Sequence, residues 1–417
     1  MQHARNNETI SRPHSCYLKD ILRNMTKELK HCTRSMKDLL IDMKDTSELM
    51  MDLAYSAVIY DDKEIATEVI RLEEKMDTLG YYMMISAMLS ARRLDEAEAL
   101  AGVLKAGAAA ENISNAAGDI AKIALLDLGI PVELKPDLRG AEETIASATV
   151  SPESPMAGRT LGEIELETET GMWLIAIRRG RNWIYDPDHS TLVKAGDVVF
   201  ARGHDEGVPL FMECATRKRY ARTRVEPERV IGDLDRAVDL IVEMKNMSEL
   251  AVGLAYSAML FYNKEIAEEV RYIEDKMDGM RYELQHWVLE SAKHIEDVNK
   301  LRGLLHLANA SEAISDAAYD IADVVLREIE PHPIMALAVR ESDEVVTKLQ
   351  IAHGSEVARK SLGELKLETE TGVHIMAVKR GDRWIYSPGA KTVLCAGDML
   401  IARGTMSGEE LLIEMCS

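Results

Sequence analysis

The sequence predicts an α+β multidomain protein in which a three-helix bundle, followed by a small α/β domain, occurs twice in tandem. First, the hexapeptide LETETG stands at 166–171 and again at 367–372, a shift of 201 residues (367 − 166). Second, this shift aligns 43–77 with 244–278 without a gap, with 20 identities in 35 positions. Third, each unit changes from helical periodicity to short alternating apolar runs halfway along. A repeat of this length identifies a duplicated unit.

Composition limits the function classes. The 417 residues suffice for several domains, and the net charge of −21 argues against a nucleic-acid partner, which needs a basic surface. The longest apolar stretch, 250–262, is shorter than the roughly 20 residues that a membrane helix needs, so no direct membrane span is expected. The five Cys have irregular spacing and form no CxxC pair. We therefore expect free thiols in a reducing, cytoplasmic compartment, without a secretory signal.

The pattern divides the chain into six segments. A basic cluster between the units has two interpretations, a solvated linker or an electrostatic contact with an anionic membrane surface or an acidic partner. The predicted segments are a polar N-terminal extension at 1–33, a helical bundle at 34–130, an α/β domain at 131–214, a basic linker at 215–234, a second bundle at 235–331 and a second α/β domain at 332–417.

Three antiparallel helices are expected in each bundle. Residues 34–128 contain no Pro, and their apolar residues recur at helical spacing. Asp61 and Asp62 follow the first helix and suit a cap of the second. A third helical run covers about 95–128 and ends at Gly129 and Pro131, a typical helix stop.

After Pro131 the apolar residues alternate or form short runs, which predicts strands at 144–150, 173–177, 183–185 and 197–201. Ser154 and Pro155 suit the cap and first turn of a short helix. The hexapeptide LETETG precedes an apolar strand and ends in Gly, so we interpret it as a structural turn.

Acidic residues recur at four-residue spacing on the second and third helices of each bundle. Like charges in this pattern destabilise an isolated helix, unless a cation or full solvation compensates. Oxygen ligands suit a divalent or iron-type metal, whereas an exposed acidic stripe is the alternative. Asn115 stands where the second unit has an acid, so tighter binding is expected in the second bundle. The candidate ligands are Glu73, Asp77, Glu111, Asp119, Glu274, Asp278, Glu312, Asp316 and Asp320.

No catalytic motif occurs. The sequence lacks GxSxG, P-loop, HExxH and GxGxxG patterns, and no His accompanies the acidic clusters. We therefore expect a protein that is not an enzyme. The absence of GxGxxG argues against NAD as a cofactor.

The helical segments resemble PhoU domains. The resemblance is carried by the run from Asp61 to Asp77 and by the run Glu111-Asn-Ile-Ser-Asn115-Ala-Ala-Gly-Asp119. It implies three-helix bundles, some of which hold metal clusters through E/DxxxD carboxylates. Glu73–Asp77, Glu274–Asp278 and Asp316–Asp320 fit this form, whereas Asn115–Asp119 departs from it.

The α/β segments resemble the TrkA C-terminal domain, the C-terminal part of an RCK domain. The motif runs from Ser154-Pro155 through Gly158-Arg-Thr160-Leu-Gly and Trp183-Ile-Tyr185 to Ala195-Gly196-Asp197, and the second copy departs with Ser355-Glu356 at its start. The resemblance implies a module that regulates potassium channels and transporters. Such modules dimerise and bind a small effector in the dimer cleft, cyclic di-AMP in some relatives. The nucleotide-binding lobe that usually precedes them is missing.

Four basic residues beside a strand turn suit an anionic effector, or are surface residues next to a turn. They are Arg178, Arg179, Lys379 and Arg380.

Taken together, the resemblances imply a cytoplasmic regulatory subunit of a membrane cation channel or transporter. Potassium is the first candidate for the transported ion, and magnesium is the second. It would reach the inner face of the membrane through its partner. The alternative is a PhoU-type adaptor in phosphate uptake signalling. The paired modules predict either a homodimer or an intrachain pseudo-dimer.

Overall fold

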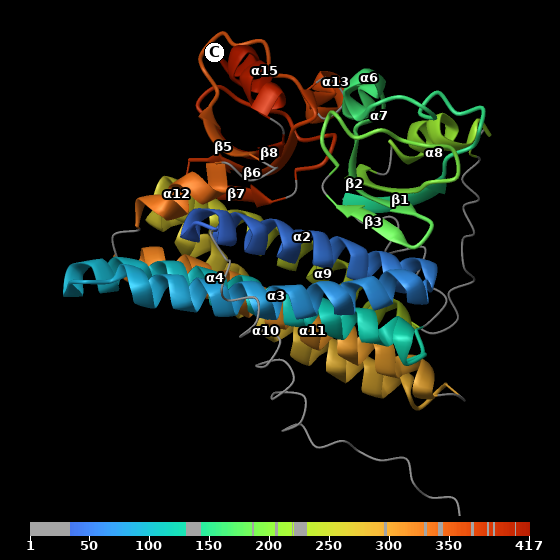
Figure 1. Ribbon diagram of the computed structural model, residues 1–417, viewed down its shortest axis with the longest axis horizontal. Helices are drawn as coiled ribbons and strands as arrows, with labels where there is room; N and C mark the ends of the chain where they lie inside the picture. The colour runs from blue at the N-terminus through green and yellow to red at the C-terminus, as the bar shows by residue number, and fades with distance from the viewer. Residues whose placement is uncertain are drawn as a thin grey trace, which may run out of the picture.

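In the computed structural model, two antiparallel sheets lie side by side above a layer of long helices (Figure 1). Three predicted parts lie outside the described residues. They are the extension at 1–33, the start of the first α/β domain at 131–142 and most of the basic linker. The described residues are 34–130, 143–185, 187–204, 207–218, 220, 232–295, 298–328, 332–340, 345–367, 371–381, 383–386, 388–404 and 406–417.

The first bundle consists of α2 (Met36–Tyr60), α3 (Lys63–Ser90) and α4 (Leu94–Leu125). Asp62 caps α3, because its side chain accepts hydrogen bonds from the backbone N–H groups of Glu64 and Ile65. Asp61 instead ends α2 in the left-handed conformation, with φ 55°. The two adjacent aspartates therefore serve two different helices.

The second bundle repeats this arrangement with α9 (Gly232–Phe261), α10 (Lys264–Ser291) and α11 (Arg302–Leu326), the last preceded by the 3₁₀ turn η1 (Val298–Leu301). Asn263 caps α10 as Asp62 caps α3. The expected duplication of a three-helix bundle is confirmed. At the two ends of the predicted linker, the helix Val208–Thr216 precedes it and α9 begins at Gly232.

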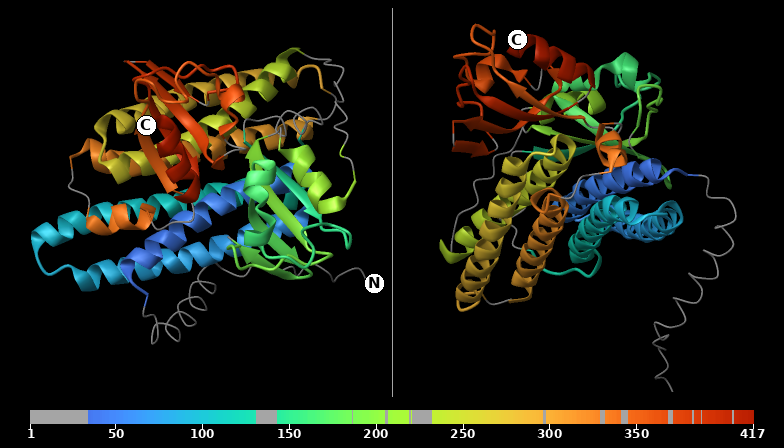
Figure 2. Two further views of the ribbon diagram at one scale, coloured as in Figure 1. Left: turned by 90° about the horizontal axis from the view of Figure 1, so that it is seen from above. Right: turned by 90° about the vertical axis from the view of Figure 1, so that its left-hand side faces the viewer.

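The two bundles pack against each other within the chain, mainly through α4 and α11 (Figure 2). Apolar side chains from both bundles belong to one continuous core. At this contact the Lys105 ammonium on α4 pairs with Asp323 and lies 3.3 Å from Asp320 on α11. The bundles thus form a pseudo-dimer inside one chain.

Each sheet has four antiparallel strands. The first comprises β1 (Glu143–Thr149), β2 (Met172–Arg179), β3 (Asn182–Tyr185) and β4 (Val198–His204) in the order β1-β4-β2-β3. The second comprises β5 (Val345–Gln350), β6 (His374–Arg380), β7 (Arg383–Tyr386) and β8 (Met399–Gly404) in the order β5-β8-β6-β7. The four strands predicted in the first unit are all present.

Two local expectations are corrected. Most of LETETG is the one-turn helix α7 (Leu166–Thr170), which Gly171 ends with φ 68°, a conformation that favours Gly. The segment after Ser154 forms turns and not a helix. The Ser154 hydroxyl accepts from Met156 N–H and donates to the Cys214 carbonyl, which holds these turns against the sheet domain.

Several short helices were not predicted. They are α6 (Leu161–Ile164), α8 (Val208–Thr216), α12 (Pro333–Arg340), α13 (Leu362–Leu365) and α15 (Met406–Cys416).

One face of each sheet joins the helical core. Ile145, Ile175 and Phe200 of the first sheet belong to the same buried cluster as the bundle helices, as do Met376 and Ile401 of the second. The other face of each sheet packs on its own short helices and forms a smaller separate core. Each sheet therefore lies between the helical layer and its own helices.

Candidate functional site: the junction of sheets and bundles

The predicted carboxylates of the first bundle gather between α3 and α4. Burial, followed by the charge of Asp77, raises the pKa of Glu111. Burial is also the largest cause of the raised pKa of Glu73. Two glycines make room for these acids, because a Cβ on Gly80 would lie 2.6 Å from Glu111 Oε2, and one on Gly118 would overlap the Glu73 carboxylate.

A lysine partly neutralises this first cluster. Lys122 Nζ lies 2.7 Å from Asp119 Oδ1, and its charge lowers the pKa of Glu73, against the effect of burial. The cluster therefore combines half-buried carboxylates with one cation that belongs to the chain.

In the second bundle an arginine stands where the first has Gly80. Arg281 Nη2 lies 3.0 Å from Asp278 Oδ1 and 3.3 Å from Glu312 Oε1. Burial, followed by the charge of Asp316, raises the pKa of Glu312 to about 7. Burial and the neighbouring Asp316 also raise the pKa of Glu274.

The two clusters offer only oxygen donors, which suits a hard cation. Among the described residues, however, no three potential ligands gather in an arrangement that would hold a metal. In the second bundle, a metal that used both Asp278 and Glu312 would have to displace Arg281. Metal binding therefore stays a prediction.

The four candidate effector residues all contact carboxylates of the chain. Two of them join a sheet to the start of a bundle helix. Arg178 Nη1 lies 2.6 Å from Glu64 Oε2 on α3, and Lys379 Nζ lies 2.5 Å from Glu265 Oε2 on α10. Because these glutamates are exposed, each pair alone contributes little to stability.

The other two candidates brace their own sheet. Arg179 donates two hydrogen bonds to the carboxylate of Asp197, of 2.9 and 2.7 Å, and a third to the Leu192 carbonyl. Arg380 contacts Asp398 and the Val393 carbonyl in the same way. These contacts favour a structural role for both arginines, and an effector contact stays a prediction.

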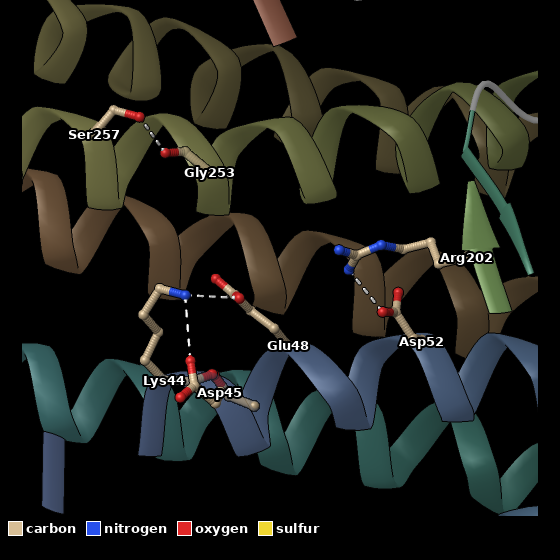
Figure 3. Close-up of polar contacts among 8 residues, drawn as sticks. Lys44, Asp45, Glu48, Asp52, Arg202, Gly253 and Ser257 are labelled. Atoms are coloured by element: carbon tan, nitrogen blue, oxygen red, sulfur yellow. Dashed lines mark hydrogen bonds and ion pairs between the residues drawn. The ribbon is translucent and has the colours of Figure 1, made fainter. Parts of the chain in front are cut away.

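A buried ion pair joins the first sheet to its bundle. Arg202 Nη1 on β4 lies 2.8 Å from Asp52 Oδ2 on α2, with side chains only 10% and 6% exposed (Figure 3). Beside it, the Tyr60 hydroxyl donates a hydrogen bond of 2.7 Å to the Ile145 carbonyl on β1. Such buried polar contacts need good geometry to offset the loss of hydration.

A second polar contact lies at the end of β3. The Tyr185 hydroxyl donates to Glu68 on α3, and Arg71 Nη2 lies 2.6 Å from both Glu68 Oε1 and the Tyr185 hydroxyl. Its counterpart in the second unit keeps the tyrosine and the acid, since Tyr386 donates to Glu269 on α10.

The junction of the second unit is otherwise less polar. Gly253 replaces Asp52, and a Cβ there would lie 2.7 Å from Met376 Sδ on β6, so a thioether occupies this space. Phe261 replaces Tyr60 and lies under the Lys348 ammonium, 5.5 Å from the ring centre. The duplicated junctions thus differ at these two positions, where the first unit has Asp52 and Tyr60 and the second has Gly253 and Phe261.

Where α2 and α9 face each other, two buried lysines lie near the tyrosines of the opposite bundle. Lys44 Nζ is 5.4 Å from the ring centre of Tyr256, and Lys245 Nζ is 5.3 Å from that of Tyr55. Figure 3 shows Lys44 with its acidic neighbours Asp45 and Glu48 on α2. These contacts place buried charged groups between the two bundles.

The two sheet domains also contact each other, and the LETETG repeats meet there. A Cβ on Gly372, which ends the second repeat, would lie 3.9 Å from Glu167 Cβ in the first. Burial at this site raises the pKa of Glu167. In Figure 1, α6, α7 and α13 lie between the two sheets. The repeated hexapeptide therefore forms part of an intrachain domain contact.

Sequence reasoning missed the Arg202–Asp52 pair and the buried lysines. Their signal was present, because Asp52 and Lys44 are charged residues on the apolar face of a helix. Charged residues are almost never fully buried unless paired, so such positions point to a tertiary partner.

Comparison with known proteins agrees with these domains. The TrkA-C domain family matches residues 145–213 and 346–417, and the PhoU domain family matches residues 40–124 and 241–325. No curated protein matches the sequence. No helix among the described residues is both long and apolar enough to cross a membrane.

Three solved structures show limited similarity to this chain. PhoU from Pseudomonas aeruginosa is 11% identical, with 76% of this chain and 100% of that chain covered and a TM-score of 0.35. The RCK domain of GsuK is 15% identical, with 66% of this chain and 64% of that chain covered and a TM-score of 0.17. The GsuK channel bound to NAD is 13% identical, with 76% of this chain and 65% of that chain covered and a TM-score of 0.18. The chain spans less than two thirds of either GsuK chain.

Both domain families occur twice, and in the same order in each unit. The four matched segments coincide with the two helical bundles and the two sheet domains described above. The chain therefore contains two PhoU domains that alternate with two TrkA-C domains, an organisation that supports a regulatory role.

Proposed function

We propose that this protein is a cytoplasmic, non-enzymatic regulator of a membrane cation transport system, with potassium as the ion and magnesium as the alternative. The observation that carries the proposal is the attachment of each TrkA-C sheet to its own PhoU bundle through named polar contacts, Arg202–Asp52 and Arg178–Glu64 in the first unit and Lys379–Glu265 in the second. A ligand that prefers one arrangement of the sheets would thereby bias the bundles.

The proposed partner is a cation channel or transporter, which the helical bundles or the sheets contact at the inner membrane face. A small anionic effector, such as cyclic di-AMP, would act on the sheet domains. Support for this ion class comes from the TrkA-C domains alone, since the PhoU domains are equally compatible with other transport systems.

The alternative is an adaptor in phosphate uptake signalling. It is favoured by the two PhoU domains, which pack as a pair of three-helix bundles within one chain. An adaptor of this kind would leave the two TrkA-C domains without a role.

The decisive experiment is affinity isolation of the tagged protein from its native membranes, with identification of the co-purifying proteins. A cation channel or transporter as the main partner supports the first proposal, and a phosphate transporter or sensor kinase supports the second and overturns the first. A strain lacking the protein should grow more slowly at limiting potassium, with normal growth at limiting phosphate. A growth defect that occurs only at limiting magnesium would identify magnesium, and not potassium, as the transported ion.

A further inference from the structure

A pocket of about 790 Å³ opens along the outer edge of the first sheet. Strand β1 forms one wall, and it is an edge strand, since β4 is its only strand neighbour in the described sheet. Helix α8 and the residues that follow it form the opposite wall. The volume lies in the range of sites that bind small molecules.

The lining combines hydroxyl groups, one cation and apolar side chains. Ser147, Thr149 and Ser151 contribute hydroxyls, Met212 contributes apolar surface, and Lys218 and Tyr220 close one side. Lys218 takes part in no ion pair within the described part of the chain, although the protein as a whole is acidic. An unpaired lysine beside an exposed aromatic ring suits an anion that carries a ring.

One hydroxyl at this place also lacks a partner. Ser151 Oγ is buried and makes no hydrogen bond to any described residue. A buried polar group without a partner is unfavourable, and a bound polar group would relieve that state.

The second sheet domain shows how the same fold fills this space. Lys348 and Gln350 replace Ser147 and Thr149, and Ala352 replaces Ser151. The Gln350 amide reaches the Gly397 carbonyl, 3.4 Å away, and Gly397 is the counterpart of Gly196, which lines the pocket of the first domain. The shorter Thr149 in place of Gln350 therefore leaves this space open in the first domain.

We propose that this β1-edge pocket binds a small organic anion with an aromatic ring and hydrogen-bonding groups. The inference deepens the regulatory function and rests on it for its biological meaning. Arg178 and Arg179 are not among the lining residues of the pocket, and their guanidinium groups contact carboxylates of the chain. Three of its lining positions carry other residues in the second unit, so the two TrkA-C domains would differ in ligand response.

The test uses the purified full-length protein and a fluorescent aromatic anion, anilinonaphthalene sulfonate, as the probe. Thr149→Gln installs the residue of the second domain and should weaken the tightest binding step about tenfold or more, because the longer side chain enters the pocket. Lys218→Gln should weaken it by about threefold to fivefold through loss of one exposed charge contact. Lys391→Gln, an exposed lysine of the second domain, is the matched control and should have no effect.

Competition then identifies the chemistry. Benzoate and adenosine monophosphate should displace the probe, whereas inorganic phosphate at the same concentration should not. Equal titration curves for wild type, Thr149→Gln and Lys218→Gln would overturn the site, and displacement by inorganic phosphate alone would overturn the aromatic part. Thermal unfolding of each variant distinguishes a filled pocket from a damaged fold.

The outcome is independent of the transport partner. Probe binding requires no other protein, so a missing partner in the affinity isolation leaves this result intact. Conversely, a failed pocket leaves the partner assignment unchanged.

Discussion

Arg202 and Asp52 lie 150 positions apart in the sequence and form a buried ion pair, with Arg202 Nη1 2.8 Å from Asp52 Oδ2. The pair joins the first sheet to the first helix of its bundle. In the second unit, Gly253 replaces the acid and Met376 fills the space. The position of Asp52 is therefore occupied by an ion-pair partner in one copy and by a methionine thioether in the other.

Removal of one partner should be costly. Asp52→Ala leaves the Arg202 guanidinium in a buried place without its carboxylate, which should lower the free energy of unfolding by about 3 kcal/mol. Urea denaturation followed by far-UV circular dichroism measures the change. Asp42→Ala on the same helix, which loses an exposed pair with Arg34, should cost less than about 1 kcal/mol.

The double variant Asp52→Ala/Arg202→Met tests the cause. It should recover most of the lost stability, because no buried guanidinium is left without the Asp52 carboxylate. A double variant as unstable as Asp52→Ala alone would show that packing, and not the orphaned charge, dominates.

The two central tyrosines should respond differently to loss of the hydroxyl. The Tyr55 hydroxyl is 3.0 Å from Ser311 Oγ, whereas Tyr256 has Ala110 at the corresponding place. The nearby Ser47 hydroxyl donates to the Lys44 carbonyl, and no hydrogen bond of good geometry joins the Tyr256 hydroxyl to a described residue. Tyr55→Phe should therefore cost about 1 kcal/mol, and Tyr256→Phe should be neutral or slightly stabilising.

Denaturation of both variants under the same conditions provides the comparison. Ser311→Ala should destabilise the protein about as much as Tyr55→Phe, since either change breaks the same hydrogen bond. Equal losses for Tyr55→Phe and Tyr256→Phe would contradict the assignment.

The acidic cluster of the second bundle should make stability depend on pH. Burial and the Asp316 charge raise the pKa of Glu312 from 4.5 to about 7. Because the folded state binds this proton more tightly, the stabilisation is complete below pH 4.5 and is lost as pH rises through 7. Glu312→Gln keeps a neutral side chain at all pH values. Its melting temperature should exceed that of wild type by about 1–2 °C at pH 8 and equal it near pH 5.

An exposed acid provides a control of opposite sign. A hydrogen bond from Lys293 lowers the pKa of Glu290, so Glu290→Gln should be neutral or slightly destabilising at pH 8. Thermal scans at both pH values measure the two effects. A difference between Glu312→Gln and wild type that does not change with pH would contradict the raised pKa.

Arg281 should compete with metal for the second cluster. Arg281→Gly restores the residue of the first bundle and removes a positive charge that contacts Asp278 and Glu312. We expect Mn²⁺ to bind this variant about tenfold more tightly than wild type, because cation repulsion is removed and two oxygen ligands are released.

Titration calorimetry with Mn²⁺ measures the affinity. Asp316→Asn in the Arg281→Gly background should abolish the gain, since it removes one further ligand. If neither wild type nor Arg281→Gly gives measurable heat with Mn²⁺, the metal prediction is rejected for both clusters.

Local patterns predicted much of the fold because they depend on neighbours in the sequence. Helical periodicity and Asp62 as a cap specified the bundle helices, and alternating apolar residues specified the strands. The predicted stop at Gly129 was too late, because α4 already ends at Leu125. LETETG was harder, since a one-turn helix ended by Gly171 and a simple turn have the same local signature. Short helices such as α12 were missed because their formation depends on packing against α2 and α9.

The duplication, the acidic ladders and the domain families follow from the sequence by itself, because each is a property of spacing along the chain. Only the tertiary structure decided which charges meet. It paired Arg202 with Asp52, placed Arg281 against the predicted metal ligands and gave Arg179 and Arg380 carboxylate partners within their own sheets. Electrostatic interactions act over a few ångströms in space, and residues 150 positions apart acquire that proximity only when the sheets pack on the helices.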